Sequence, residues 1–187
     1  MMQVQRRILA GMLLFWIGTG HSTPLPPEPQ DCQITGTQSR VDFGTQSRAG
    51  LTANSRGRLT PGQRNIHISV ICRFPQSLLL SIAGTIHGQR FGWGDRADLR
   101  IQVRDAKLDN KSVLLSRIQG DSRIVSDGAQ TLYLNPGDFF TPVSVSGQTA
   151  GKQLSFILTA EPELDEREVT FNRPYSGQSL VTLRLEE

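Results

Sequence analysis

Short runs of alternating apolar and polar residues dominate this chain of 187 residues. The clearest run spans residues 64–72, and the residues on its apolar face are Ile66, Ile68, Val70 and Cys72. A period of two is that of a β-strand with one buried side. Phe74-Pro75 follows. Because proline cannot donate to a strand ladder, we expect the strand to break there, before a second apolar run at residues 78–82.

The rest of the chain predicts a succession of short strands separated by turns. Apolar runs that predict further strands occur at residues 41–44, 99–103, 113–115, 131–134, 154–158 and 181–185. Turns or loops are expected at 84–94, at 105–111 and after residue 134, and Pro142 interrupts an apolar run at 139–145. About eight short strands without a sustained apolar helix stripe indicate an all-β sandwich or barrel.

The N-terminus has the pattern of a secretory signal peptide. Arg6 and Arg7 precede a ten-residue apolar run at 8–17, which is too short to span a bilayer. Small residues then favour cleavage after Ser22. We therefore expect a signal peptide at 1–22, a proline-rich arm at 23–31 and one folded domain at 32–187, in a soluble, exported protein.

Charge excludes one broad class of partner. The formal net charge is +3, and removal of Arg6 and Arg7 with the signal peptide leaves +1. A basic nucleic-acid-binding surface is therefore not expected.

The cysteine content predicts a covalent tie. Cys32 and Cys72 are the only two cysteines. In an exported chain, two cysteines are typical of one disulfide. Such a bond would pin the beginning of the folded domain to the strand at 64–72.

No pattern in the sequence predicts an enzyme, a cofactor or a metal site. His67 falls on the polar face of its strand and His87 in the glycine-rich loop, and neither has a second ligand at a metal-binding spacing. A Gly-x-Ser-x-Gly nucleophile motif and a phosphate-binding loop are also missing from the sequence. Phe91 and Trp93 form a candidate ligand-binding loop, although buried anchors are the more common outcome for such residues.

The order of these motifs resembles the pilin subunits of bacterial chaperone–usher fimbriae. Those domains begin with a cysteine and a strand like Val41-Asp42-Phe43-Gly44, followed by an alternating strand that ends in a second cysteine, like residues 66–72. Later segments similar to 99–109, 154–160 and 180–185 follow in the same order. The resemblance extends from Cys32 to the C-terminus.

This resemblance implies an immunoglobulin-like β-sandwich without its last strand, the pilin fold. The open groove would be filled first by a periplasmic chaperone and then by the N-terminal extension of another subunit, a form of β-augmentation. Val181, Leu183 and Leu185 are expected to face the core and flank this groove, with Arg184 outward. The implied partners are the chaperone, an outer-membrane usher, other pilin subunits and a host or surface receptor. The implied route leads through the periplasm to the fimbrium at the cell surface.

Two features depart from the family. The chain ends Leu185-Glu186-Glu187, where family members commonly carry an aromatic residue one position before the end. The arm at 23–31 has four prolines and one leucine, so it lacks the alternating apolar residues and backbone donors of a donor strand. We therefore expect a minor, tip-located subunit that contributes to adhesion. The alternative is a free-standing secreted β-sandwich that binds a ligand through Phe91 and Trp93.

Overall fold

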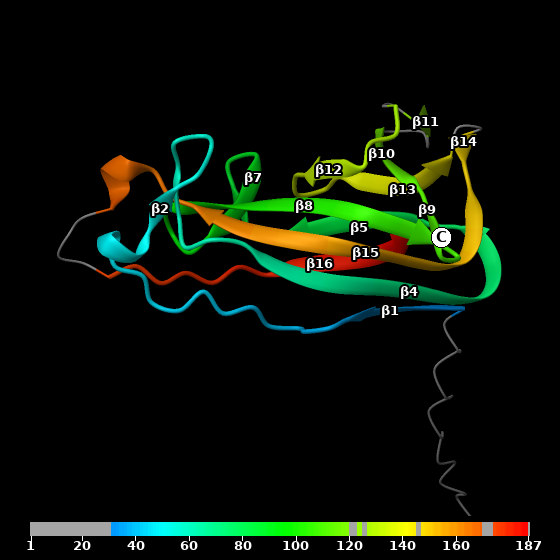
Figure 1. Cartoon of the computed structure of the whole chain (residues 1–187), viewed down its shortest axis with the longest axis horizontal. Coiled ribbons are helices and arrows are strands. Elements are labelled where there is room, and N and C mark those ends of the chain that lie inside the picture. Colours follow the sequence, from blue (N-terminus) through cyan, green and yellow to red (C-terminus); the bar gives the residue numbers. More distant parts are fainter. Residues whose placement is uncertain (1–30, 120–122, 125–126, 145–146, 170–173, 187) are drawn as a thin grey trace, which may run out of the picture.

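The computed structural model describes residues 31–119, 123–124, 127–144, 147–169 and 174–186, which form mostly antiparallel strands (Figure 1). The only helical segments in these ranges are two 3₁₀ turns, η1 (Arg48–Gly50) and η2 (Glu166–Glu168). Neither is long or apolar enough to cross a membrane. The expected signal peptide and all but the last residue of the expected arm lie outside the described residues.

The larger sheet contains eight strands. Six of them run in the order β1 (Cys32–Gly36), β4 (Arg64–Ser77), β15 (Ala150–Glu163), β8 (Ala97–Leu108), β7 (Arg90–Trp93) and β6 (Ile86–His87). Two short strands, β12 (Thr131–Leu134) and β9 (Lys111–Ser112), also pair with β8. The three long strands β4, β15 and β8 therefore form the centre of this sheet.

The smaller sheet contains six strands. Five run in the order β11 (Arg123–Ile124), β10 (Leu114–Gln119), β13 (Phe139–Ser144), β5 (Leu79–Gly84) and β16 (Val181–Glu186), and β14 (Gly147–Gln148) pairs with β13. A separate hairpin consists of β2 (Thr52–Ala53) and β3 (Leu59–Thr60). Every strand pair in the described ranges is antiparallel.

The two sheets share one hydrophobic core. Alternate residues of each sheet point into it, and those with no exposed surface include Val70, Val103, Leu154, Leu80, Ile82 and Phe140. Across the layers, Phe156 of β15 and Phe140 of β13 meet edge to face with ring centroids 5.8 Å apart. The predicted all-β, immunoglobulin-like sandwich is confirmed.

Proline interrupts the strands less than the sequence suggests. β4 continues through Phe74 and Pro75 to Ser77, so the predicted break is wrong. The β15 ladder skips this stretch, since its pairs are Ile71 with Gln153 and then Gln76 with Gly151. Pro75 therefore lies where no ladder donor is needed.

Pro142 is likewise accommodated within β13. The ladder between β13 and β5 covers only Phe139 and Phe140, so the proline lies beyond it while still opposing Leu115 of β10. The missing N–H of Pro142 consequently interrupts no β5 pairing, and the strand runs to Ser144.

Two predicted loops are shorter than expected. Residues 86–93 form the β6–β7 hairpin, which pairs with β8 and so extends the larger sheet. The turn expected at 105–111 shrinks to Asp109 and Asn110, whose φ values of 48° and 66° suit a two-residue hairpin turn.

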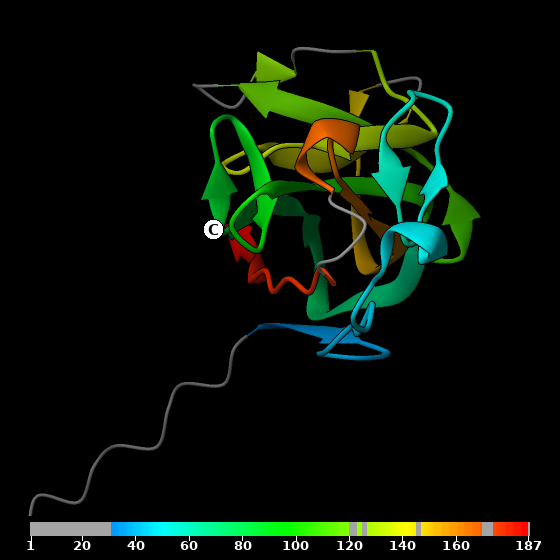
Figure 2. The same ribbon diagram turned by 90° about the vertical axis from the view of Figure 1, so that its left-hand side faces the viewer.

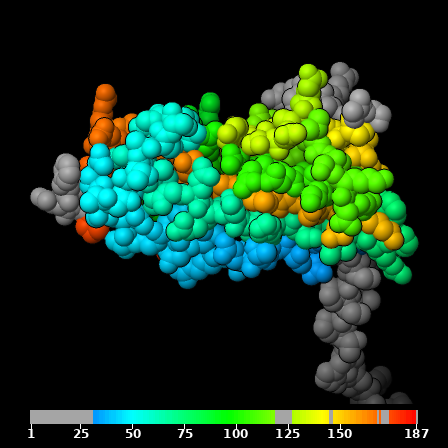
Figure 3. Space-filling view, viewed as in Figure 1, coloured from blue at the N-terminus to red at the C-terminus, as the bar shows by residue number. Residues whose placement is uncertain are grey.

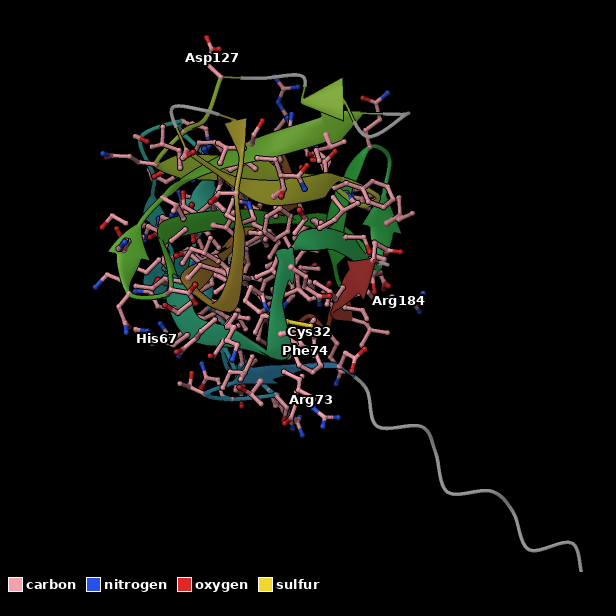
Figure 4. All side chains as sticks on the ribbon, turned by 90° about the vertical axis from the view of Figure 1, so that its right-hand side faces the viewer. Cys32, His67, Arg73, Phe74, Asp127 and Arg184 are labelled. Atoms are coloured by element: carbon pink, nitrogen blue, oxygen red, sulfur yellow. A yellow bond between two sulfur atoms is a disulfide. The ribbon has the colours of Figure 1, made fainter. Side chains whose placement is uncertain are left out.

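The predicted disulfide between Cys32 and Cys72 is present in the structure. The two residues are directly opposed in the antiparallel β1–β4 pair, with Cα atoms 4.0 Å apart. β4 is the only described strand that pairs with β1, so the bond fixes an edge strand that has a ladder on one side only (Figure 4).

Replacement of both cysteines by serine should lower the free energy of unfolding by about 4 kcal/mol, because the bond restricts a loop with a sequence separation of 40 residues. Urea titration of the variant against the oxidised wild-type protein measures this difference. Mass spectrometry of the unreduced protein checks the bond itself, and the detection of two free thiols would refute the pairing.

Candidate functional site

The two sheets are not joined along one side of the sandwich. β1 pairs with β4 at the outer edge of the larger sheet, and β16 pairs with β5 at the outer edge of the smaller one. These two outer strands lie near each other, but no strand pairing in the described ranges connects them (Figure 2). The chain runs in opposite directions along the two sides of this seam (Figure 1).

A cavity of about 1010 Å³ opens in the seam. Residues 39–45, which follow β1, form one wall, and residues 174–179, which precede β16, form the other. The central strands of the larger sheet contribute apolar residues to its lining, namely Ile66, Leu99, Ile101, Leu158 and Ala160. This cavity, called the seam groove below, therefore reaches the core of the sandwich.

One wall has the side-chain pattern of a strand without its ladder. Val41 is half-buried and Phe43 is buried, as the alternation predicts. The predicted strand at 41–44 is nevertheless not formed, since the β1–β4 ladder ends at Gly36 and no described strand pairs with these residues. The groove thus has a wall that forms no strand ladder, although Gly44 N–H donates to the Asp42 carboxylate and the Phe43 carbonyl accepts from Gln46 Nε2.

The end of the groove at Gln46 and Tyr175 is closed. The backbones of these two residues exchange two hydrogen bonds of 2.7 Å each. The Trp93 ring packs against Phe43 and Tyr175, with centroid distances of 5.8 and 5.1 Å, and Tyr175 Oη donates to the Trp93 carbonyl. A Cβ on Gly177 would lie 2.8 Å from the Trp93 ring, so this position requires glycine.

The groove also contains an unsatisfied polar group. The Ser179 hydroxyl is buried and has no hydrogen-bond partner within the described part of the chain. A buried hydroxyl without a partner is unfavourable, whereas a strand laid along this wall would bring backbone groups to it.

The last strand has the orientation that its alternation predicts. Val181, Leu183 and Leu185 are half-buried and pack against the core, whereas Arg184 is exposed and points away from the body (Figure 4). Only Val181 of these three lines the seam groove. Their predicted contact with a chaperone or donor strand stays a prediction.

Phe91 and Trp93 do not form an exposed ligand patch. Their exposed fractions are 1% and 3%, because β7 adds to the larger sheet and turns both rings inward. Both residues are instead buried anchors, the outcome that is more common for such residues in a loop. Trp93 also lines the closed end of the groove.

The groove residues themselves carry no arrangement for metal binding. Among the described residues, no group of three or more His, Cys, Asp and Glu side chains could hold a metal ion. His67 and His87 are both exposed, and His87 contacts Asp98. What the groove offers is two walls without a strand ladder beside apolar residues of the core.

No family model matches the sequence, and no curated protein matches it. Among solved structures, the chain is similar to one described as the crystal structure of the P pilus rod subunit PapA. The sequence identity is 14%, the TM-score is 0.35, and the match covers 83% of this chain and 99% of that one.

Leu183→Asp should destabilise the fold by at least about 2 kcal/mol, because it places a charge without a partner against the core. Arg184→Gln on the same strand is the matched control and should change stability by less than about 0.5 kcal/mol, since Arg184 is exposed. Denaturant titration and the amount of exported protein report both effects. Equal stability of the two variants would contradict the assigned orientation of β16.

Proposed function

We propose that this protein is a fimbrial subunit that accepts a β-strand from another chain in its seam groove. The observation that carries the proposal is the cavity of about 1010 Å³ between two chain segments that belong to no described strand, with core residues in its lining. An unpaired strand edge favours association with another chain unless something covers it. A strand supplied in trans would satisfy the wall backbones and cover the apolar floor together.

The sequence motifs support the fimbrial context. The cysteine pair, the alternating strands and the terminal strand occur in the order of chaperone–usher pilins. Of the three terminal-strand residues that this resemblance expects beside the missing strand, Val181 lines the groove. We infer that a periplasmic chaperone fills the groove first and that the extension of a neighbouring subunit replaces it at an outer-membrane usher. The role is structural and adhesive rather than catalytic.

The same reasoning extends to the position in the fibre. The arm at 23–31 has four prolines, and each of them lacks the backbone N–H that a donated strand contributes to its ladders. A subunit that accepts a strand but cannot donate one can occupy only the end of the fibre whose neighbour donates to it. We therefore propose a minor subunit at the tip, where its surface can contact a receptor.

Strand acceptance can be tested with a peptide of about ten residues that has an apolar side chain at every second position, the period of a strand face. The peptide should bind the wild-type protein, whereas a peptide with the sequence of residues 23–31 should not. Ala160→Leu should lower the affinity for the alternating peptide about tenfold, because the added side-chain atoms occupy the groove. Fluorescence anisotropy of labelled peptides measures both affinities.

Ala83→Leu supplies the matched control for this experiment. Ala83 lies exposed on β5 and does not line the groove, so the same substitution there should leave the peptide affinity unchanged. Equal affinities of the two variants, or binding of the proline-rich peptide as tight as that of the alternating one, would refute strand acceptance at this groove.

The tip position can be tested by deletion of residues 23–31. Incorporation into fibres should continue, because the deleted arm is expected to donate nothing, and immunogold particles should label fibre ends. Loss of polymerisation, or labelling along the shaft, would show instead that the arm donates and that the subunit lies within the fibre.

A further inference from the structure

A second cavity lies at a break in the edge of β8. One edge of β8 pairs with β15 along most of its length. On the other edge, β7 pairs with residues 97–99 and β12 pairs with residues 101–104, so that Arg100 falls between the two short strands. The cavity at this break, called the Arg100 notch below, has a volume of about 550 Å³.

The Arg100 notch is rich in arginine. Arg56 and Arg58 from the β2–β3 hairpin, Arg90 from β7 and Arg100 from β8 all line it, together with Tyr133 of β12. In the space-filling view, the hairpin (cyan) and β12 (yellow-green) flank β15 (orange) on the same face (Figure 3). Two carboxylates, Asp98 and Glu163, also belong to the lining.

Three of these arginines are already paired with carboxylates. Arg56 contacts Glu163, and it contacts Glu161 at 3.2 Å. Arg58 lies 3.2 Å from Asp165, and Arg90 lies 3.1 Å from Asp98. These ion pairs hold the hairpin and β7 in place and leave the carboxylates of the notch engaged.

Arg100 is different. Its guanidinium lies over the Tyr133 ring at 3.8 Å from the centroid, and no ion pair joins it to a carboxylate in the described part of the chain. Tyr133 itself is 47% exposed, so part of its side chain faces solvent. Stacking orders the guanidinium and leaves its N–H donors available to an anion.

We propose that the Arg100 notch binds a saccharide that carries an anionic group, either a carboxylate or a sulfate. Arg100 would bind the anionic group through paired N–H donors, the geometry in which arginine recognises such anions. The part of the Tyr133 ring that Arg100 leaves uncovered would pack against the apolar face of the sugar. A volume of about 550 Å³ lies in the range of small-ligand pockets and suits one or two sugar rings better than an extended acidic peptide.

This site goes beyond strand acceptance and does not depend on it. Leu99 and Ile101 line both cavities, but Arg100 and Tyr133 line the Arg100 notch alone. Substitutions at Arg100 and Tyr133 therefore probe the saccharide site without altering the lining of the seam groove.

The test is a calorimetric titration of the purified, disulfide-bonded chain with 3′-sialyllactose, a sulfated heparin disaccharide, neutral lactose and hexaglutamate. One or both anionic sugars should bind, and the stronger of the two identifies the anionic group. Arg100→Gln should weaken that binding about tenfold through the loss of a charge-assisted pair of hydrogen bonds. Tyr133→Leu should weaken it as well.

Arg104→Gln is the matched control, because Arg104 lies four positions further along the same strand, contacts Asp105 and does not line the notch. It should leave the affinity unchanged, and the melting temperatures of the three variants should match the wild type. The proposal is overturned if neither anionic sugar binds with a dissociation constant below about 10 mM. It is also overturned if lactose or hexaglutamate binds as tightly as the anionic sugars, or if the Arg100 and Tyr133 variants retain wild-type affinity for them.

Discussion

The passage of the chain from one sheet to the other at Leu78 determines most of this architecture. Leu78 has no exposed surface, and its carbonyl accepts a buried hydrogen bond of 2.9 Å from the Thr141 hydroxyl. β4 ends immediately before it and β5 begins immediately after it. Because β1 pairs with β4 and β16 pairs with β5, this one passage holds the first and last strands on the same side of the sandwich, with the seam between them.

The sequence predicts the strands well where one face is uniformly buried. The alternation at Ile68 and Val70, and again at Leu154 and Phe156, matches the buried positions of β4 and β15. It fails where hydrogen-bond partners decide the outcome. Pro75 lies within a strand because the neighbouring ladder skips it, whereas residues 41–44 alternate like a strand but pair with no described strand.

The candidate site is less accessible to sequence reasoning than the fold. The alternation of the last strand predicts that Val181 faces inward, and Val181 does line the seam groove. The wall at residues 174–179 has no periodic pattern of apolar residues, so the sequence does not predict its place beside the groove. The structure explains only Gly177, because a side chain there would collide with the Trp93 ring. The notch at Arg100 depends on where two short strands stop along β8, and single-sequence periodicity does not specify such an end point.

The position of Trp93 gives the molecule an intrinsic optical probe. The chain has two tryptophans, Trp16 and Trp93, and Trp16 belongs to the segment expected to be removed as a signal peptide. The exported protein would then contain one indole, packed against Tyr175 at the closed end of the seam groove. Its emission wavelength and its quenching by acrylamide would therefore report the hydration of that end, without any attached label.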